Sequence, residues 1–317
     1  MSITTGLHHV SIHAGDPGRN VEFYTAVLGL RLVKKTVNFE DAGVYHLYFG
    51  DEAARPGTLL TFFPYPHIAP GRLGVGEVEE IGLRVPAASL GFWMHRFLEK
   101  GVVHEGIVKR FGQSLLPFRD PDGTRLALVG LAGIEDEPAG GAIAPEHAIR
   151  GFHGVSLLLE EAGPTAAVLT HAFGFVEMGS EGTRTRYGIP GATIGGVVDL
   201  HAVGGFLKPR PGGGSVHHIA FRAEDDAAQA EMARKLAQDH DLDVTEVKDR
   251  KYFRSVYARE PGHVLLEIAT DQPGMSIDEP MESLGQTLQL PPFFEARRSW
   301  IEKSLPPIRL TEPSQER

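Results

Sequence analysis

The 317-residue chain contains no cysteine, which excludes disulfides, thiolate metal sites and cysteine nucleophiles. Any metal must therefore be held by nitrogen and oxygen ligands. The chain has no run of Lys or Arg, and its formal net charge is −10, so nucleic acid is not an expected partner. It also lacks a run of about 18 apolar residues and a basic leader followed by an apolar stretch. These absences predict a cytoplasmic protein with no membrane partner.

The chain does contain a repeated pattern of one strand, one helix and three further strands, which alternation and Gly/Pro punctuation predict in each copy. The copies span residues 6–65, 78–131, 149–203 and 215–271. The predicted fold class is therefore α+β, with four βαβββ units whose curved mixed sheets enclose a site. The predicted organisation is an N-terminal domain of two units (1–133), a linker (134–147), a C-terminal domain of two units (148–272), and a tail with a short helix (273–317).

Two histidine doublets, His8–His9 and His217–His218, lie in similar apolar strands of the first and fourth units. Because neighbouring side chains of a strand point to opposite faces, each doublet is expected to split. His9 and His218 have small neighbours on their face and are expected to line a cavity, whereas His8 and His217 lie on the bulky, packed face. The third unit keeps the first histidine and has Gly154 in place of the second, which favours a supporting role for the first histidines.

A third candidate ligand lies in the closing strand of the fourth unit, within "PGHVLLEIAT". Glu267 is an acid in an apolar strand, and an unpaired buried carboxylate is costly unless a cation stabilises it. The corresponding residue of the second unit is Ala127, so the fold does not require the acid. Core histidines and an ion-paired glutamate are the alternative, but matched positions in repeated units favour a metal site. The set fits an Fe(II) or Mn(II) facial triad as well as a hydrolytic zinc site.

These residues resemble those of the vicinal oxygen chelate superfamily, which includes glyoxalase I, bleomycin-resistance proteins and extradiol dioxygenases. Over essentially the whole chain, the sequence is similar to ring-cleaving dioxygenases of para-hydroquinones, in "LHHVSIHAGDPGRNVEFYTAVLGL", "GSVHHIAFRA", "DRKYFRSVYAREPGHVLLEIATD" and "LPPFFEARRSWIEKSLPP". The resemblance implies two tandem glyoxalase/bleomycin-resistance/dioxygenase-type domains. It also implies Fe(II), with Mn(II) as the alternative, on His9, His218 and Glu267.

The resemblance further implies the reaction and the residues around the metal. An aromatic hydroquinone would be opened by O₂ next to a hydroxylated ring carbon, as in aromatic hydrocarbon catabolism. Tyr257 would hydrogen-bond the substrate or assist proton transfer, and Arg250 would support that network. His8 and His217 match supporting residues near the metal.

Three alternatives remain open from the sequence: a glyoxalase-type metal-dependent lyase, a catechol extradiol dioxygenase, and a non-catalytic small-molecule-binding resistance protein. Gly154 stands where the resemblance places a histidine ligand of catechol enzymes. Ala127 stands where a lyase would place a further carboxylate. The sequence predicts neither the accepted ring substituents nor the oligomeric state, and a homo-oligomer is one option.

Overall fold

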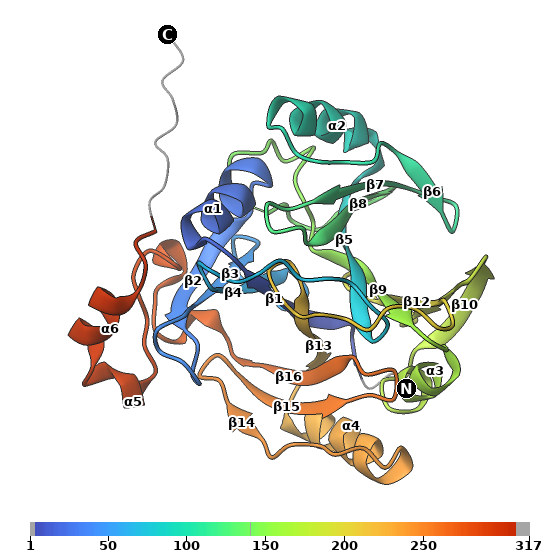
Figure 1. The fold of residues 1–317 in the computed structure, drawn as a ribbon. Helices are drawn as coiled ribbons and strands as arrows, with labels where there is room; N and C mark the ends of the chain where they lie inside the picture. Colours follow the sequence, from blue (N-terminus) through green and yellow to red (C-terminus); the bar gives the residue numbers. More distant parts are fainter. Residues whose placement is uncertain (1–3, 140, 309–317) are drawn as a thin grey trace.

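Each of the four repeats folds as predicted, in a computed structural model that describes residues 4–139 and 141–308 (Figure 1). The first unit contains β1 (Leu7–Ala14), α1 (Pro17–Glu22), β2 (Arg31–Val37), β3 (Tyr45–Gly50) and β4 (Leu59–Pro64). The second contains β5 (Glu77–Pro86), α2 (Leu90–Glu99), β6 (Val108–Arg110), β7 (Gln113–Arg119) and β8 (Arg125–Leu131).

The second half of the chain repeats this order. The third unit contains β9 (Phe152–Leu159), α3 (Gly163–His171), β10 (Val176–Glu181), β11 (Arg184–Gly188) and β12 (Val197–Ala202). The fourth contains β13 (Val216–Ala223), α4 (Asp226–Asp239), β14 (Lys248–Asp249), β15 (Phe253–Arg259) and β16 (Leu265–Pro273). The structure therefore has the predicted α+β class.

Side-chain caps set the start of two of the helices. Asp16 accepts a hydrogen bond from the backbone N–H of Arg19 at the start of α1, and Asp225 does the same for Ala228 in α4. Such caps satisfy amide groups that have no partner within the helix. The first helix continues as a π-helical turn over Phe23–Val27. No helix in residues 4–139 or 141–308 is long and apolar enough to cross a membrane.

The two eight-stranded sheets each combine one unit from either half of the chain. The first sheet has the order β14-β15-β16-β13-β1-β4-β3-β2, so it joins the first and fourth units. The second has the order β10-β11-β12-β9-β5-β8-β7-β6 and joins the second and third units. In each sheet the two opening strands pair antiparallel at the centre, β1 with β13 and β5 with β9. The division into sequence domains at the linker stays a prediction.

One extra residue interrupts the pairing in each opening strand. In the first sheet, Leu7 pairs with Phe221 and His9 with Ala220, so His8 has no counterpart on β13. His217 is the corresponding extra residue of β13. In the second sheet the register shifts in the same way around Glu79 of β5 and His153 of β9. These β-bulges locally break the alternation of side chains.

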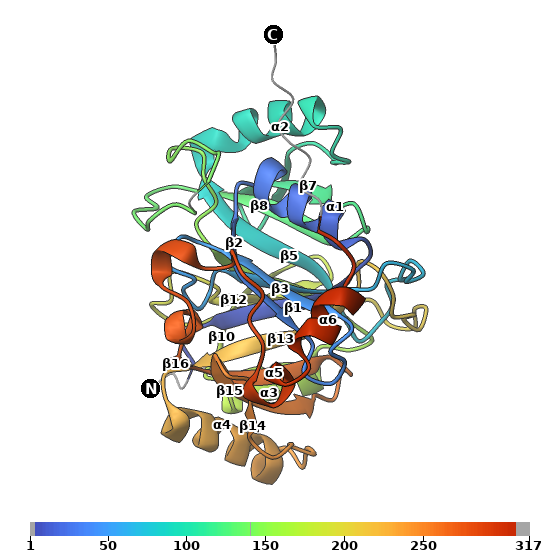
Figure 2. The ribbon, with the colours of Figure 1, turned by 90° about the vertical axis from the view of Figure 1, so that its left-hand side faces the viewer.

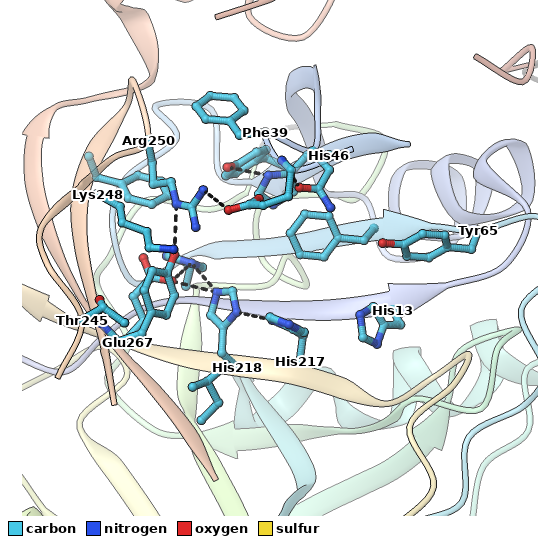
Figure 3. A pocket seen from close by; sticks show the side chains of 18 residues that line it. His13, Phe39, His46, Tyr65, His217, His218, Thr245, Lys248, Arg250 and Glu267 are labelled. Atoms are coloured by element: carbon cyan, nitrogen blue, oxygen red, sulfur yellow. Dashed lines mark hydrogen bonds and ion pairs between the residues drawn. The ribbon is translucent and has the colours of Figure 1, made fainter. Parts of the chain in front are cut away.

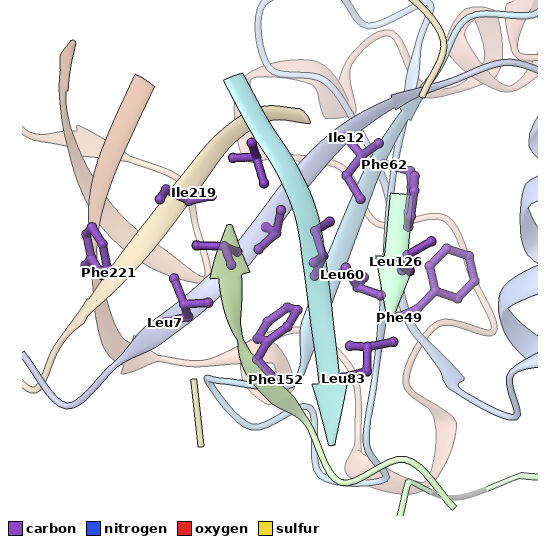
Figure 4. Packing of buried hydrophobic residues seen from close by; sticks show 14 of the residues in the cluster. Leu7, Ile12, Phe49, Leu60, Phe62, Leu83, Leu126, Phe152, Ile219 and Phe221 are labelled. Atoms are coloured by element: carbon purple, nitrogen blue, oxygen red, sulfur yellow. The ribbon is translucent and has the colours of Figure 1, made fainter. Parts of the chain in front are cut away.

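A single apolar cluster joins both sheets and their helices (Figure 4). Leu7, Ile12 and Ile219 of the first sheet and Leu83 and Phe152 of the second belong to it, all with 1% exposure or less. It also includes Val21, Trp93, Val168 and Met232, from α1 to α4 respectively. The helices and the two sheets therefore share one core, which leaves the other face of the first sheet for a site.

The tail covers the β2 edge of the first sheet and forms two short helices, α5 (Pro292–Glu295) and α6 (Arg298–Ser304), where one was predicted (Figure 2). Lys35 of β2 bridges to Leu288. The fully buried Lys34 places its Nζ 2.6 Å from both Asp278 Oδ1 and Glu279 Oε2. A buried ammonium is tolerated only when it is paired in this way. The tail therefore closes an edge strand that would otherwise expose its backbone groups.

The buried His153 should make the fold less stable at acidic pH. Burial, together with Arg186 and Arg84, lowers the pKa of this histidine to about 3. Its Nε2 is buried without a hydrogen-bond partner in the part of the chain that the structure describes. Below about pH 6.5 the unfolded chain binds a proton there and the folded chain does not, so acid favours unfolding.

Between pH 7 and pH 5 the wild type should therefore lose about 2 kcal/mol more unfolding free energy than His153→Gln. Urea unfolding at both pH values measures the difference. His95→Gln, at an exposed helix position, is the matched control and should behave as the wild type. Equal pH dependence in all three proteins would contradict the assignment.

Candidate metal centre

Three side chains from three adjacent strands meet in the first sheet: His9 of β1, His218 of β13 and Glu267 of β16 (Figure 3). His9 Nε2 lies 3.2 Å from His218 Nε2, and Glu267 Oε2 lies 3.5 Å and 2.9 Å from these two nitrogens. Ligand atoms at about 2.1 Å from one metal ion are separated by roughly 3.0–3.4 Å when the coordination is octahedral or tetrahedral. All three side chains are buried, so the geometry fits one divalent ion.

The two histidines of each doublet lie side by side, and the prediction that they occupy opposite faces is wrong. His8 Nδ1 is 2.9 Å from His9 Nδ1, and His217 Nδ1 is 2.7 Å from His218 Nδ1. The reason is the bulge in each strand, because the extra residue turns toward the face of its neighbour. His8 packs on the ring of Phe253 at 5.1 Å, and His217 lines the cavity beside His218.

These contacts determine where the protons of the two candidate ligands lie. Burial lowers the pKa of His8 and of His218. His8 donates a hydrogen bond to the backbone carbonyl of Thr270, which leaves its Nδ1 as an acceptor for the Nδ1–H of His9. The Nε2 lone pair of His9 then points at the Glu267 carboxylate. A neighbour that holds a ligand in one tautomer is a regular feature of metal sites.

The Glu267 carboxylate indicates a cation in the same place. Burial alone raises the pKa of this carboxyl, but the facing His9 and His218 rings outweigh burial and hold the pKa well below its usual range. Ser255 Oγ donates to Oε1 at 2.5 Å, whereas the buried Oε2 has no hydrogen-bond donor in the described part of the chain. Two imidazole nitrogens and a carboxylate oxygen that face one another are stabilised by a positive charge between them.

Tyr257 and Arg250, which the sequence placed in the site, lie together at its edge. Tyr257 is paired with Glu267 across β15 and β16. Its hydroxyl accepts a hydrogen bond from Arg250 Nε at 3.3 Å. Burial and the Glu267 charge raise the pKa of Tyr257, so the phenol keeps its proton near neutral pH. Arg250 Nη1 also donates a hydrogen bond to Glu40 Oε1 at 2.7 Å.

A cavity of 380 Å³ opens at these side chains and is lined mainly by rings. Sequence reasoning left His46 without a role and did not consider Phe63, yet both line the cavity and stack at 4.2 Å. Each ring nitrogen of His46 has a partner, the Thr61 hydroxyl and the Tyr48 hydroxyl, both at 3.0 Å. Two sequence features could have indicated the residues that line the cavity: the alternation of β1 beyond His9 and the alternation of β4 from Thr61 to Phe63. The missing information was which strand lies beside β1.

Comparison with known proteins identifies the family. A family model described as "Glyoxalase/Bleomycin resistance protein/Dioxygenase superfamily" matches residues 6–128. "Putative ring-cleaving dioxygenase MhqO" of Bacillus subtilis is 43% identical over 98% of this chain and 98% of its own length. The chain belongs to the glyoxalase/bleomycin resistance protein/dioxygenase superfamily. The predicted superfamily is thereby confirmed.

Two further relatives resemble the whole chain. "Chlorohydroquinone/hydroquinone 1,2-dioxygenase" of Sphingobium indicum is 33% identical over 95% of both chains. A crystal structure of a "putative dioxygenase" from Bacillus subtilis covers 98% of this chain and 100% of its own, with 41% identity and a TM-score of 0.92. The architecture with two eight-stranded sheets is thus that of a solved dioxygenase-like relative.

The second sheet has the same strand pairing as the first, but it lacks the three candidate metal ligands. In the first sheet His218 lies opposite Ser11 and Glu267 beside Ala220. The corresponding pairs of the second sheet place Glu80 opposite Ser156 and Ala127 beside Gly82.

Gly154 takes the place of His9 in this second sheet, where a Cβ atom would collide with the carbonyl oxygen of Val197. A side chain cannot be accommodated there, so the triad cannot form in the second sheet. In the described residues, the three residues of the first sheet are the one His/Cys/Asp/Glu group that could hold a metal ion.

Metal binding at the triad should raise the unfolding free energy of the protein. A ligand at about one hundred times its Kd raises the unfolding free energy by about 2.7 kcal/mol when it binds only the folded state. Mn(II) added to EDTA-treated protein should raise the melting temperature accordingly, and Glu267→Gln should abolish the rise. Glu79→Gln, which changes a partly buried, ion-paired acid of the second sheet, is the control and should retain it. A rise that survives Glu267→Gln would show that the ion binds elsewhere.

Proposed function

We propose that the protein is an Fe(II)-dependent dioxygenase that opens para-hydroquinones with O₂ next to a hydroxylated ring carbon. The observation that carries the proposal is the buried His9–His218–Glu267 triad in the wall of a ring-lined cavity. A 33% identical relative named as a chlorohydroquinone/hydroquinone 1,2-dioxygenase supports the substrate class.

The site residues would divide the work in the following way. His9, His218 and Glu267 would hold the metal, and His8 and His217 would fix the tautomers of the two histidines through their Nδ1 contacts. When bound, Fe(II) would act as a Lewis acid that favours ionisation of a substrate hydroxyl and as a reductant that can react with O₂. Three protein ligands leave coordination positions open for such chemistry.

Tyr257 would act on the substrate itself. Its ring lies 5.7 Å from that of His218, and its protonated hydroxyl can donate to a substrate oxygen. The hydrogen bond from Arg250 stabilises negative charge that develops on this network. In the overall step the ring carbon–carbon bond and the O–O bond break, and both oxygen atoms end in the ring-opened semialdehyde.

Oxygen uptake tests this proposal. Protein loaded anaerobically with Fe(II) should consume one O₂ per hydroquinone and yield a product composed of hydroquinone plus both oxygen atoms. Tyr257→Phe should lower kcat by about 10²-fold, within the usual range for a lost proton donor, whereas His9→Ala and Glu267→Ala should remove activity together with bound iron. His201→Ala, which removes a histidine of the second sheet, serves as the control.

The same assay separates the other functions of the superfamily. Uptake of O₂ with catechol but not with hydroquinone would show that the protein is a catechol dioxygenase. Turnover of a hemithioacetal without O₂ would assign a lyase, and tight binding without turnover of any of these compounds would assign a binding protein. Full activity after Glu267→Ala would contradict the ligand assignment.

A further inference from the structure

The cavity at the metal centre has two chemically different ends (Figure 3). Arg250, Lys248 and Thr245 lie at one end, and His13 and Tyr65 lie at the other, with His217 and His218 between them. The charged residues that line the cavity, apart from Glu267, are Glu40, Lys248 and Arg250, and they belong to the first end. The second end, called the aromatic arm here, consists of His13, Phe63 and Tyr65.

The aromatic arm follows from the parallel pairing of β1 with β4. Ser11 pairs with Thr61 and His13 with Phe63, so these four side chains lie on the same face of the sheet. Next to the triad the strands present two hydroxyls, joined by a hydrogen bond of 2.6 Å. Farther out they present only rings. From His9 to His13 the strand rises about 13 Å, which is longer than one six-membered ring.

The rings of the arm form a continuous wall. The centroid of the His13 ring lies 5.1 Å from that of His217, 6.3 Å from that of Phe63 and 5.9 Å from that of Tyr65. Exposure increases outward, from the buried Ser11 and Thr61 to the partly buried rings. Such a surface stabilises apolar groups that leave water.

The arm continues into an open groove of 560 Å³ that shares His13 and Tyr65 with the cavity. The remaining residues that line this groove are Pro66, His67, Ile68, Pro211 and Gly212. None of the lining residues in the described chain is Asp, Glu, Lys or Arg. A charged substituent would therefore gain no partner in this direction, whereas an apolar chain could run from the triad to the surface.

We propose that the cavity takes hydroquinones that carry an apolar side chain, alkyl or prenyl in character, with the chain lying along the aromatic arm. The position of the ring rests on the proposed hydroquinone cleavage. The position of the chain rests on the lining of the arm and the groove.

A series of 2-alkylhydroquinones tests the proposal with two readouts. Anaerobic calorimetry on the Mn(II)-loaded protein should give a Kd that falls about two- to fourfold per methylene from methyl- to butylhydroquinone, as expected for apolar burial. With the Fe(II)-loaded protein, kcat/KM from oxygen uptake should rise in parallel. A Kd that is independent of chain length, or no binding of any alkylhydroquinone, would overturn the proposal.

Substitutions in the arm and the groove locate the chain. Tyr65→Ala and Ile68→Asp should reduce the ratio of kcat/KM for hexylhydroquinone to that for hydroquinone about tenfold or more. Met178→Asp, at an exposed apolar position on β10 of the other sheet, is the matched control and should leave the ratio unchanged. An unchanged ratio in both arm variants would place the chain elsewhere and contradict the proposal.

The two readouts separate the two proposals. Chain-length-dependent binding without O₂ uptake would support the aromatic arm and contradict hydroquinone cleavage. Oxygen uptake with hydroquinone but no effect of chain length would support the cleavage and contradict the arm.

Discussion

The metal centre depends on the antiparallel pairing of β1 with β13, strands whose histidines lie 209 positions apart in the chain. This pairing places His218 opposite Ser11, two residues along β1 from His9. Because β16 pairs with the other edge of β13, it adds Glu267 beside Ala220. A slip of one residue in either pairing would turn a ligand away from the others. The apolar residues that alternate with the ligands, such as Val10 and Ile219, oppose such a slip because they are packed in the core.

The β-bulges let one short sequence supply both a candidate ligand and the group that orients it. In a regular strand, His8 would point away from His9. As the extra residue of the bulge it contacts His9 and completes a hydrogen-bonded path to the Thr270 carbonyl. The same bulge recurs in the second sheet at Glu79 and His153. The backbone feature therefore belongs to the repeat, and only the residues placed on it distinguish the sheet with the triad from the sheet without it.

Polar and apolar side chains line different parts of the cavity. Charged side chains line one end of the cavity and the rings of the aromatic arm line the other, with His217 and His218 between them. This arrangement suits a molecule with a polar ring head and an apolar extension. It also keeps the aromatic arm away from Lys248 and Arg250. The polar groups of the substrate and its apolar chain would therefore be bound by different parts of the protein.

The sequence by itself determined the repeat, its order of elements and the residues with unusual chemistry, because periodicity and composition are local properties. Comparison of the units singled out His9, His218 and Glu267, since the other copies carry Gly154 and Ala127. Only the tertiary structure decided which strands pair and where the pairing shifts, because strand partners and bulges depend on contacts between distant segments. For that reason His8 and His217 were assigned to the wrong face, and the aromatic lining that includes His46 and Phe63 was missed. It forms only when β4, beside β3, lies next to β1.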